Sequence, residues 1–210
     1  MVAKVLPPLY LITNRHHTRH RPLLLILKEA LQAGVRLIQL REKDLSTRHL
    51  IALGNDVLAL AREYGATLMI NDRLDIVQAL GADGVHLRSD SLPVRAARQL
   101  LGPQDLMGVS CHSVQAILQV EREGANFAVL GPIYPTPSKQ RFGPPLGLRV
   151  LQKARGVCHI PIYAIGGITA QRVSEVKEAG AYGVAMISFL LEAESVFSAT
   201  KLMLDALQES

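Results

Sequence analysis

The segment Leu80-Gly81-Ala82-Asp83-Gly84-Val85 decides how the rest of the chain is interpreted. A helical spacing of apolar residues ends at Leu80, a glycine suited to a helix C-terminus follows, and a short apolar run begins at Gly84. The same step recurs at Ala33-Gly34-Val35, Glu123-Gly124-Ala125-Asn126 and Ala179-Gly180-Ala181-Tyr182-Gly183-Val184. This repetition indicates one supersecondary unit, a helix leading into a strand, used along the whole chain.

Short apolar runs rich in β-branched residues predict eight strands, at Leu9–Thr13, Val35–Leu40, Thr67–Ile70, Gly84–Leu87, Leu106–Val109, Phe127–Leu130, Ile160–Ile165 and Gly183–Ile187. Helical spacing predicts the segments that follow them, at Leu24–Gln32, Thr47–Tyr64, Leu74–Leu80, Val94–Leu101, Val114–Glu123, Leu146–Ala154, Ala170–Ala179 and Val196–Leu207. Uninterrupted apolar strands are buried on both faces, as parallel sheets require. Eight successive short strand–helix units predict a single-domain (β/α)8 barrel, an α/β TIM barrel spanning residues 1–210.

A doubly wound parallel sheet is the alternative architecture. That fold predicts a glycine-rich loop directly after the first strand, where a dinucleotide would bind. The chain has Thr13-Asn14-Arg15-His16 at this place, with no glycine. The barrel is therefore favoured.

The composition of the chain excludes several classes of protein. The 210 residues are 49% hydrophobic and 20% charged, which excludes disordered and collagen-like chains. Cys111 and Cys158 lie far apart, so we expect two buried thiols and neither a disulfide scaffold nor a zinc site. No apolar run is long enough to span a bilayer and the first residues lack a signal peptide pattern, so a cytoplasmic protein is expected. The net charge of +5 favours an anionic partner.

Polar residues follow several predicted strands, and in a barrel of this type the C-terminal strand ends form the active face. After the second strand, Gln39, Arg41 and Lys43 alternate, so their side chains point the same way. After the third, Asn71 precedes Asp72, a carboxylate that suits Mg2+ or caps the following helix. The fourth strand leads to Asp90, and the fifth ends with Ser110 and His112 on one face.

The later strands are followed by glycine and hydroxyl residues. The segment 131–143 after the sixth strand has the composition of a lid over an anion. Gly166-Gly167 follows the seventh strand and Ile187-Ser188 the eighth, and backbone N–H groups at these two places commonly bind phosphate. We therefore expect a phosphorylated substrate on this side of the mouth and a second anionic group with Mg2+ on the other. The run Arg15–Arg21, with three His and three Arg, is interpreted as a solvated loop.

The chain resembles the thiamine phosphate synthase and thiazole tautomerase superfamily, and is closer to the synthases. The similarity runs along nearly the whole chain, through the motifs Tyr10–Thr13, Ile38–Lys43, Ile70–Arg73, Asp83–Leu87, Gly131–Thr136, Ala164–Ile168 and Gly183–Ala185. It implies a transferase of thiamine biosynthesis that joins hydroxymethylpyrimidine diphosphate to hydroxyethylthiazole phosphate and releases pyrophosphate. Loss of the diphosphate first leaves a pyrimidine carbocation, which the thiazole nitrogen captures.

The resemblance also assigns residues. It implies that Gln39, Arg41, Lys43, Asn71, Ser110 and Lys139 bind the pyrimidine diphosphate. It implies that the thiazole phosphate is bound by Thr136, Ser138, Gly167, Ile187 and Ser188, and that the Mg2+ cofactor is bound by Asp72. Of these, Arg41, Lys43 and Lys139 are expected to stabilise the leaving group, because they are cations at the diphosphate. His112 is the further candidate for acid or base catalysis.

The loop after the fourth strand departs from the synthase pattern. Synthases have Gly-Gln-x-Asp there, whose last carboxylate is a second Mg2+ ligand, and this chain has Arg88-Ser89-Asp90-Ser91. Asp90 is the candidate for the second Mg2+ ligand, but it lies one residue early and is expected to point elsewhere unless the loop rearranges.

Two alternatives and the partners complete the expectations. A thiazole tautomerase needs no metal and uses a histidine at the position of His112, and a non-catalytic barrel that binds phosphorylated metabolites is the third reading. The synthase is favoured because the chain has all the residues that the resemblance assigns to the diphosphate and its metal, namely Gln39, Arg41, Lys43, Asn71, Asp72 and Lys139. Small phosphorylated molecules are the expected partners, with no nucleic acid and no membrane, and the sequence leaves open whether the chain forms a homo-oligomer.

Overall fold

Eight parallel strands close into a barrel in the computed structural model, which describes residues 6–136 and 143–209. The strands are β1 Leu9–Ile12, β2 Leu37–Leu40, β3 Thr67–Asn71, β4 Gly84–Leu87, β5 Leu106–Cys111, β6 Phe127–Leu130, β7 Ile162–Ile165 and β8 Gly183–Met186. Each pairs with its neighbours in chain order, and β8 closes on β1 with Leu9 opposite Val184. The predicted (β/α)8 barrel is confirmed. Its extent as one domain over 1–210 stays a prediction.

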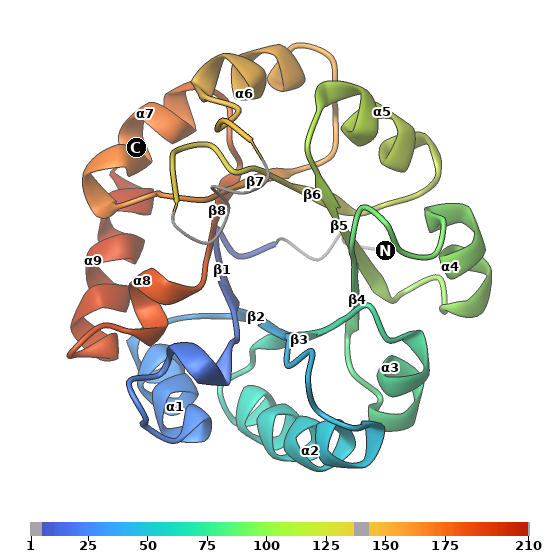
Figure 1. The fold of residues 1–210 in the computed structure, drawn as a ribbon, viewed down its shortest axis with the longest axis vertical. Helices are drawn as coiled ribbons and strands as arrows, with labels where there is room; N and C mark the ends of the chain where they lie inside the picture. Colours follow the sequence, from blue (N-terminus) through green and yellow to red (C-terminus); the bar gives the residue numbers. More distant parts are fainter. Residues whose placement is uncertain (1–5, 137–142, 210) are drawn as a thin grey trace.

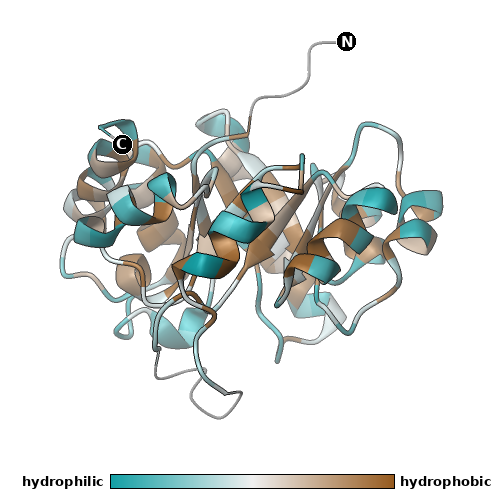
Figure 2. Ribbon diagram, turned by 90° about the horizontal axis from the view of Figure 1, so that it is seen from above, coloured by the Kyte–Doolittle hydropathy of each residue, from teal (hydrophilic) through white to brown (hydrophobic). Residues whose placement is uncertain are grey.

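The helices form a ring outside the strands (Figure 1). They are α1 Leu23–Ala33, α2 Thr47–Glu63, α3 Leu74–Leu80, α4 Val94–Leu100, α5 Val114–Arg122, α6 Leu148–Arg155, α7 Val173–Glu178, α8 Ser188–Leu191 and α9 Val196–Gln208, with short 3-10 turns η1 Arg15–His17 and η3 Ala170–Arg172. Figure 2 shows apolar residues on the strands and the inward faces of the helices, and polar residues outside. None of these described helices is long and apolar enough to cross a membrane.

Two buried clusters share the strands because alternate side chains point to opposite faces. One set, such as Leu11, Ile38 and Ile70, packs outward against the helices. The other set points into the barrel and includes Tyr10, Met69, Phe127 and Tyr163. This inward set continues towards the C-terminal strand ends as polar side chains, and it therefore builds the floor of the mouth.

The strand ends differ from the prediction in a way that matters for the site. The strand β5 runs to Cys111 and β3 to Asn71, so Ser110 and Asn71 lie within paired strands and not after them. Asn71 is paired with His86 of β4 and Ser110 with Val129 of β6, which makes these side chains better fixed than loop residues. Cys111 and Cys158 are buried free thiols, as expected.

The segment that begins at Arg15 is more ordered than a solvated loop. Asn14 caps the 3-10 turn η1 by accepting a hydrogen bond from the backbone of His16. Arg15 contacts the buried carboxylate of Glu42 through its backbone N–H and its guanidinium. The loops after β1 and β2 are thus joined, and a buried acid required a basic partner that the sequence pattern did not pair with it.

Candidate active site

A hydrogen-bonded row of four side chains crosses the barrel below the mouth. Gln39 Nε2 donates to the Tyr10 hydroxyl at 2.9 Å, that oxygen lies 3.3 Å from Nδ1 of His86, and His86 Nε2 lies 2.9 Å from Oγ of Ser110. These residues come from β2, β1, β4 and β5, and all occupy inward positions. The strand order alone brings them together, because they are spread from residue 10 to residue 110 in the chain.

The donor and acceptor in each hydrogen bond of this row can be assigned by starting from Gln39. An amide N–H of Gln39 donates, so the Tyr10 hydroxyl hydrogen is left for His86 Nδ1. The other ring nitrogen of His86 then carries the proton and donates to Ser110. Burial lowers the pKa of His86 to about 3, which keeps the ring neutral at physiological pH. The hydroxyl hydrogen of Ser110 is therefore directed to a partner other than His86, on the side of the mouth.

Arg41 stands at the end of β2, next to this row. Its backbone N–H donates to Thr13 Oγ1 at 2.9 Å, and Thr13 donates in turn to the buried Glu42 at 2.6 Å. Burial lowers the pKa of Arg41, the carboxylate of Glu42 opposes that effect, and the charge of Arg88 adds to the lowering. Arg41 is thus a half-buried cation close to a second cation, an arrangement that an anionic ligand would stabilise.

Arg88, which follows β4, binds the acidic residue at the end of β3. Its Nε donates to Oδ2 of Asp72 at 2.8 Å, and its Nη1 lies 3.5 Å from Oδ2 of Asp90. The backbone N–H of Arg88 also reaches Asp72, at 3.5 Å. The hydrogen bond that Arg88 donates to Asp72 raises the pKa of Arg88. A guanidinium thus occupies the position between the two candidate metal ligands.

Asp72 is held in place by its own backbone as well. Its φ of +62° lies in the left-handed region, and its N–H donates to the carbonyl of His86 at 2.9 Å. The helix α3 that follows has no side-chain cap, so the alternative interpretation of Asp72 as a helix cap is wrong. The Asp72 carboxylate, mostly buried at 18% exposure, faces Arg88 instead.

The described residues do not fit a magnesium ion held by two carboxylates. Asp72 already accepts the guanidinium of Arg88, Asp90 is 72% exposed, and Ser91 occupies the position of the second aspartate. Within residues 6–136 and 143–209, no group of three or more His, Cys, Asp or Glu is arranged to hold a metal. Magnesium at Asp72 therefore stays a prediction from the resemblance, and the geometry around Arg88 speaks against it.

The opposite side of the mouth is built from backbone. Gly166 and Gly167 follow β7 with φ of +99° and +66°. A Cβ on Gly167 would lie 2.7 Å from the carbonyl oxygen of Pro135, so only glycine fits. Tyr134 N–H donates to the Gly166 carbonyl at 3.0 Å, which joins the loops after β6 and β7. Glycine is thus required here by the close packing of the two loops against each other.

Tyr134 and Arg172 support this turn from outside. Arg172 donates to the carbonyl of Gly167 at 2.6 Å, and its guanidinium lies 4.3 Å from the centre of the Tyr134 ring. The Tyr134 hydroxyl donates to Glu175 at 2.6 Å. Ile187 and Ser188 stand where β8 meets α8, and Thr136 lines a surface pocket with Tyr134. All three thus lie at C-terminal strand ends or in the loops that follow them.

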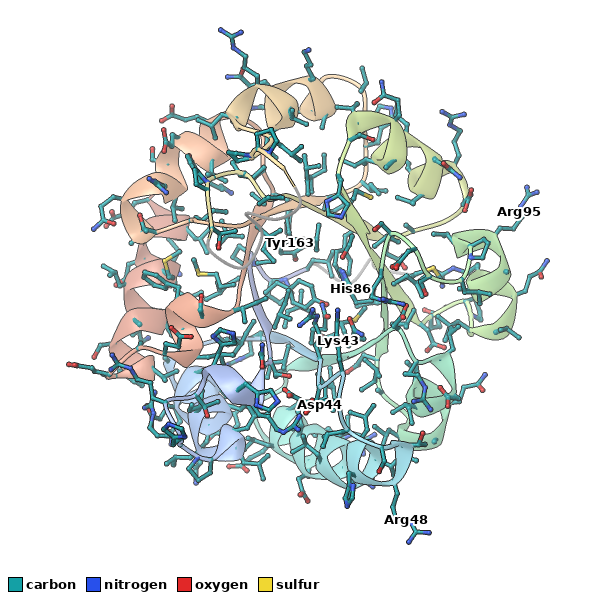
Figure 3. The ribbon with its side chains drawn as sticks, in the orientation of Figure 1. Lys43, Asp44, Arg48, His86, Arg95 and Tyr163 are labelled. Carbon is teal, nitrogen blue, oxygen red and sulfur yellow. The ribbon has the colours of Figure 1, made fainter. Side chains whose placement is uncertain are left out.

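The remaining predicted residues divide into three groups. His112 is placed after β5, where Nδ1 lies 2.6 Å from the Gly131 carbonyl; that nitrogen must donate, so Nε2 is the one that can accept a proton. Lys43 is exposed and lies within the ring of strands in Figure 3, whereas Arg48 and Arg95 project outward. Ser138 and Lys139 lie outside the described residues.

Three residues of this site were not assigned a role from sequence: Tyr10, His86 and Arg88. A signal existed for His86 and Arg88, because residues 84, 86 and 88 alternate in the same way as Gln39 and Arg41. An inward histidine in an otherwise apolar strand requires a polar partner. The identity of the partners is a matter of barrel register and could not be read from the chain.

Fold and site together define an enzyme that handles anionic substrates at the C-terminal mouth of a (β/α)8 barrel. The model of the family described as thiamine monophosphate synthase matches residues 9–190, most of the chain. The chain belongs to this family, and it is a transferase of the thiamine-phosphate synthase type.

Named relatives agree with this assignment. A putative thiamine-phosphate synthase of Geobacter sulfurreducens is 47% identical over 190 residues, with 90% of this chain and 89% of the relative covered. A thiamine-phosphate synthase of Roseiflexus castenholzii is 41% identical, with 93% and 86% covered. The solved thiamine phosphate pyrophosphorylase from Pyrococcus furiosus superposes with a TM-score of 0.87 at 34% identity, covering 96% of this chain and 95% of that one.

Proposed function

We propose that this chain condenses hydroxymethylpyrimidine diphosphate with hydroxyethylthiazole phosphate to give thiamine phosphate and pyrophosphate. The observation that carries the proposal is the division of the mouth into two anion-binding sides above one polar floor. Arg41 and Arg88 lie on one side, the Gly166-Gly167 turn lies on the other, and the row from Gln39 to Ser110 lies between them. Two substrates that each carry phosphate match two such sides.

The pyrimidine diphosphate belongs on the side with the arginines. Its pyrimidine ring reaches the floor, where the Ser110 hydroxyl hydrogen is directed to a ring nitrogen and the Asn71 amide faces inward at the end of β3. The diphosphate then lies against Arg41 and Arg88, with Lys43 above them. Positive charge at the diphosphate lowers the barrier to breaking the bond between the methylene carbon and oxygen, since the leaving pyrophosphate gains charge in that step.

The thiazole phosphate belongs on the side with the glycines. The N–H groups at Gly167, Ile187 and Ser188 supply hydrogen-bond donors without positive side chains. The thiazole nitrogen is then held towards the pyrimidine methylene carbon, and its lone pair forms the new carbon–nitrogen bond. Thr136 contributes from the loop after β6, and the roles of Ser138 and Lys139 rest on the resemblance alone.

We make further proposals for magnesium, for His112 and for the location of the protein. The Mg2+ that the resemblance implies would be held by one carboxylate, Asp72, which Arg88 already binds. The proposed reaction is therefore written without a metal. His112 is proposed as an auxiliary acid or base near the glycine side. A cytosolic location and the absence of nucleic acid or membrane partners stay predictions from the sequence.

The deciding experiment uses the purified chain with both substrates. Thiamine phosphate and pyrophosphate are expected in equal amounts, measured by chromatography, once with Mg2+ and once with a chelator. A thiazole carboxylate phosphate incubated alone tests the tautomerase alternative. Absence of thiamine phosphate under both conditions would reject the proposed reaction.

A further inference from the structure

The feature that the family pattern does not explain is the arginine at the mouth. Arg88 stands where the synthase pattern has a glycine, and Ser91 stands where it has an aspartate. Glycine has no side chain, so its replacement places a new guanidinium in the space next to Asp72. The contact at 2.8 Å shows that this guanidinium uses the carboxylate as its partner.

The two changes preserve the local charge. A divalent cation with two carboxylates sums to zero, and the Arg88 guanidinium with Asp72 also sums to zero, whereas the carboxylate of Asp90, 3.5 Å from Arg88, is 72% exposed to solvent. If the arginine replaced the metal and the aspartate stayed, the site would carry a net negative charge. If the aspartate alone were lost, the site would bind the metal more weakly. The pair of changes is therefore compatible with one cation replacing another.

The geometry leaves the guanidinium able to bind a second anion. Nε of Arg88 donates to Asp72, and Nη1 lies 3.5 Å from Asp90. A guanidinium carries five N–H donors in a rigid fork, so further donors remain for another anion. Its side chain remains 42% exposed. The charge of Arg88 adds to the lowering of the pKa of Arg41 that burial causes, so an anion bound by both guanidinium groups would relieve the repulsion between them.

We propose that Arg88, fixed by Asp72, takes the place of the divalent cation at the diphosphate, so that pyrophosphate binding and release in this chain do not require Mg2+. This inference rests on the proposed function for its reaction step. In that step the methylene carbon–oxygen bond of the pyrimidine diphosphate breaks, and its electron pair stays on the pyrophosphate oxygen that faces Arg88 and Arg41. The thiazole nitrogen then supplies the electron pair of the new bond, so no redox partner or proton donor is needed.

The binding test uses inorganic pyrophosphate as the probe and isothermal titration calorimetry in the presence of a chelator. The unaltered chain should bind it without metal, and Arg88→Gly should weaken the binding about 10- to 100-fold, since a charge-assisted contact is lost. Arg95→Ala removes the same charge from an exposed position on α4 that projects away from the mouth, and it should bind as the unaltered chain does (Figure 3).

A second variant keeps the test decisive. Arg88→Gly combined with Ser91→Asp should restore tight pyrophosphate binding only when Mg2+ is added. If Arg88→Gly does not fold, as circular dichroism would show, Arg88→Gln serves in its place. Pyrophosphate binding by the unaltered chain that appears only with Mg2+, or binding that is unchanged in the Arg88 variant, would overturn the inference.

The condensation assay separates this inference from the proposed function. Thiamine phosphate formed in the chelator supports both. Thiamine phosphate formed only with Mg2+ keeps the function and overturns the role of Arg88. Metal-free pyrophosphate binding that depends on Arg88, with no thiamine phosphate under any condition, keeps the role of Arg88 and rejects the function.

Discussion

The two sides of the mouth, each proposed to bind an anion, differ in the groups that they present. The side of β2 to β4 presents the charged side chains of Arg41, Asp72 and Arg88. The Arg41 backbone is bonded to the buried Thr13, and Arg88 is bonded to Asp72. On the side of β6 to β8, Gly166 and Gly167 present backbone instead, and Arg172 faces a carbonyl from outside. A diphosphate that must leave gains from full charges, whereas a phosphate that only anchors a substrate is served by neutral N–H donors.

The largest effect is expected from removing charge on the first side. Arg41→Ala should lower kcat for thiamine phosphate formation about 10²- to 10³-fold, because a cation at the leaving group is lost. The KM for the thiazole phosphate should change little, since that substrate lies on the other side. Steady-state kinetics with each substrate varied in turn measures both. Arg48→Ala, an exposed arginine on α2, is the matched control and should keep the rate. A kcat within threefold of the unaltered chain would show that Arg41 is not part of the machinery.

A smaller effect is expected from the glycine side. Gly167→Ala forces a side chain to within 2.7 Å of the Pro135 carbonyl oxygen and should raise the KM for the thiazole phosphate roughly 10- to 100-fold, with a smaller change in kcat. Gly65→Ala has a similar φ of +62° but open space around it, and Gly156→Ala has neither strain nor crowding. These two controls separate backbone strain from loss of the turn. An unchanged KM in Gly167→Ala would remove the glycine turn from the substrate site.

The smallest effect concerns the floor that both sides share. The folded chain holds His86 neutral down to a pKa of about 3, and an unfolded histidine titrates near 6.5. Between these values the unfolded state binds a proton that the folded state does not, so stability falls as the pH is lowered. The slope from one histidine is at most about 1.4 kcal/mol per pH unit.

His86→Gln should therefore flatten the stability profile between pH 6.5 and 5, above the range where most carboxylates titrate. Urea unfolding at several pH values measures this slope. His159→Gln removes an exposed imidazole and should leave the profile as it was. Equal slopes in the unaltered chain and His86→Gln would mean that His86 is not held neutral in the floor.

The order and type of the elements were predictable because they depend on local pattern. All eight strands and the eight predicted helices are present in the described residues, and β4, β6 and α3 have the predicted bounds. The turn η1 and the helix α8 were not expected, since each is too short to show a helical period. Strand ends shifted by up to two residues at β2, β5 and β7, where pairing with neighbours decides how far a strand extends.

The candidate site was predictable in position and not in its contacts. Alternation along β2 placed Gln39 and Arg41 on the inner face, and the structure keeps them there. Gln39 was expected to meet substrate, but it is buried at 1% exposure and donates to Tyr10. The register between paired strands, here β1 and β2, sets such contacts, and no local pattern encodes it.

The sequence by itself determined the repeating helix-to-strand unit, the barrel and the polar strand ends, because hydrophobic period and glycine punctuation act over a few residues. Tertiary structure alone decided which polar residues meet. Closure of the barrel brought Tyr10, His86 and Ser110 into one row and set Arg88 on Asp72. Arg88, an isolated departure from the family pattern in the sequence, became the partner of a candidate metal ligand, because closure of the barrel brings the ends of β3 and β4 side by side.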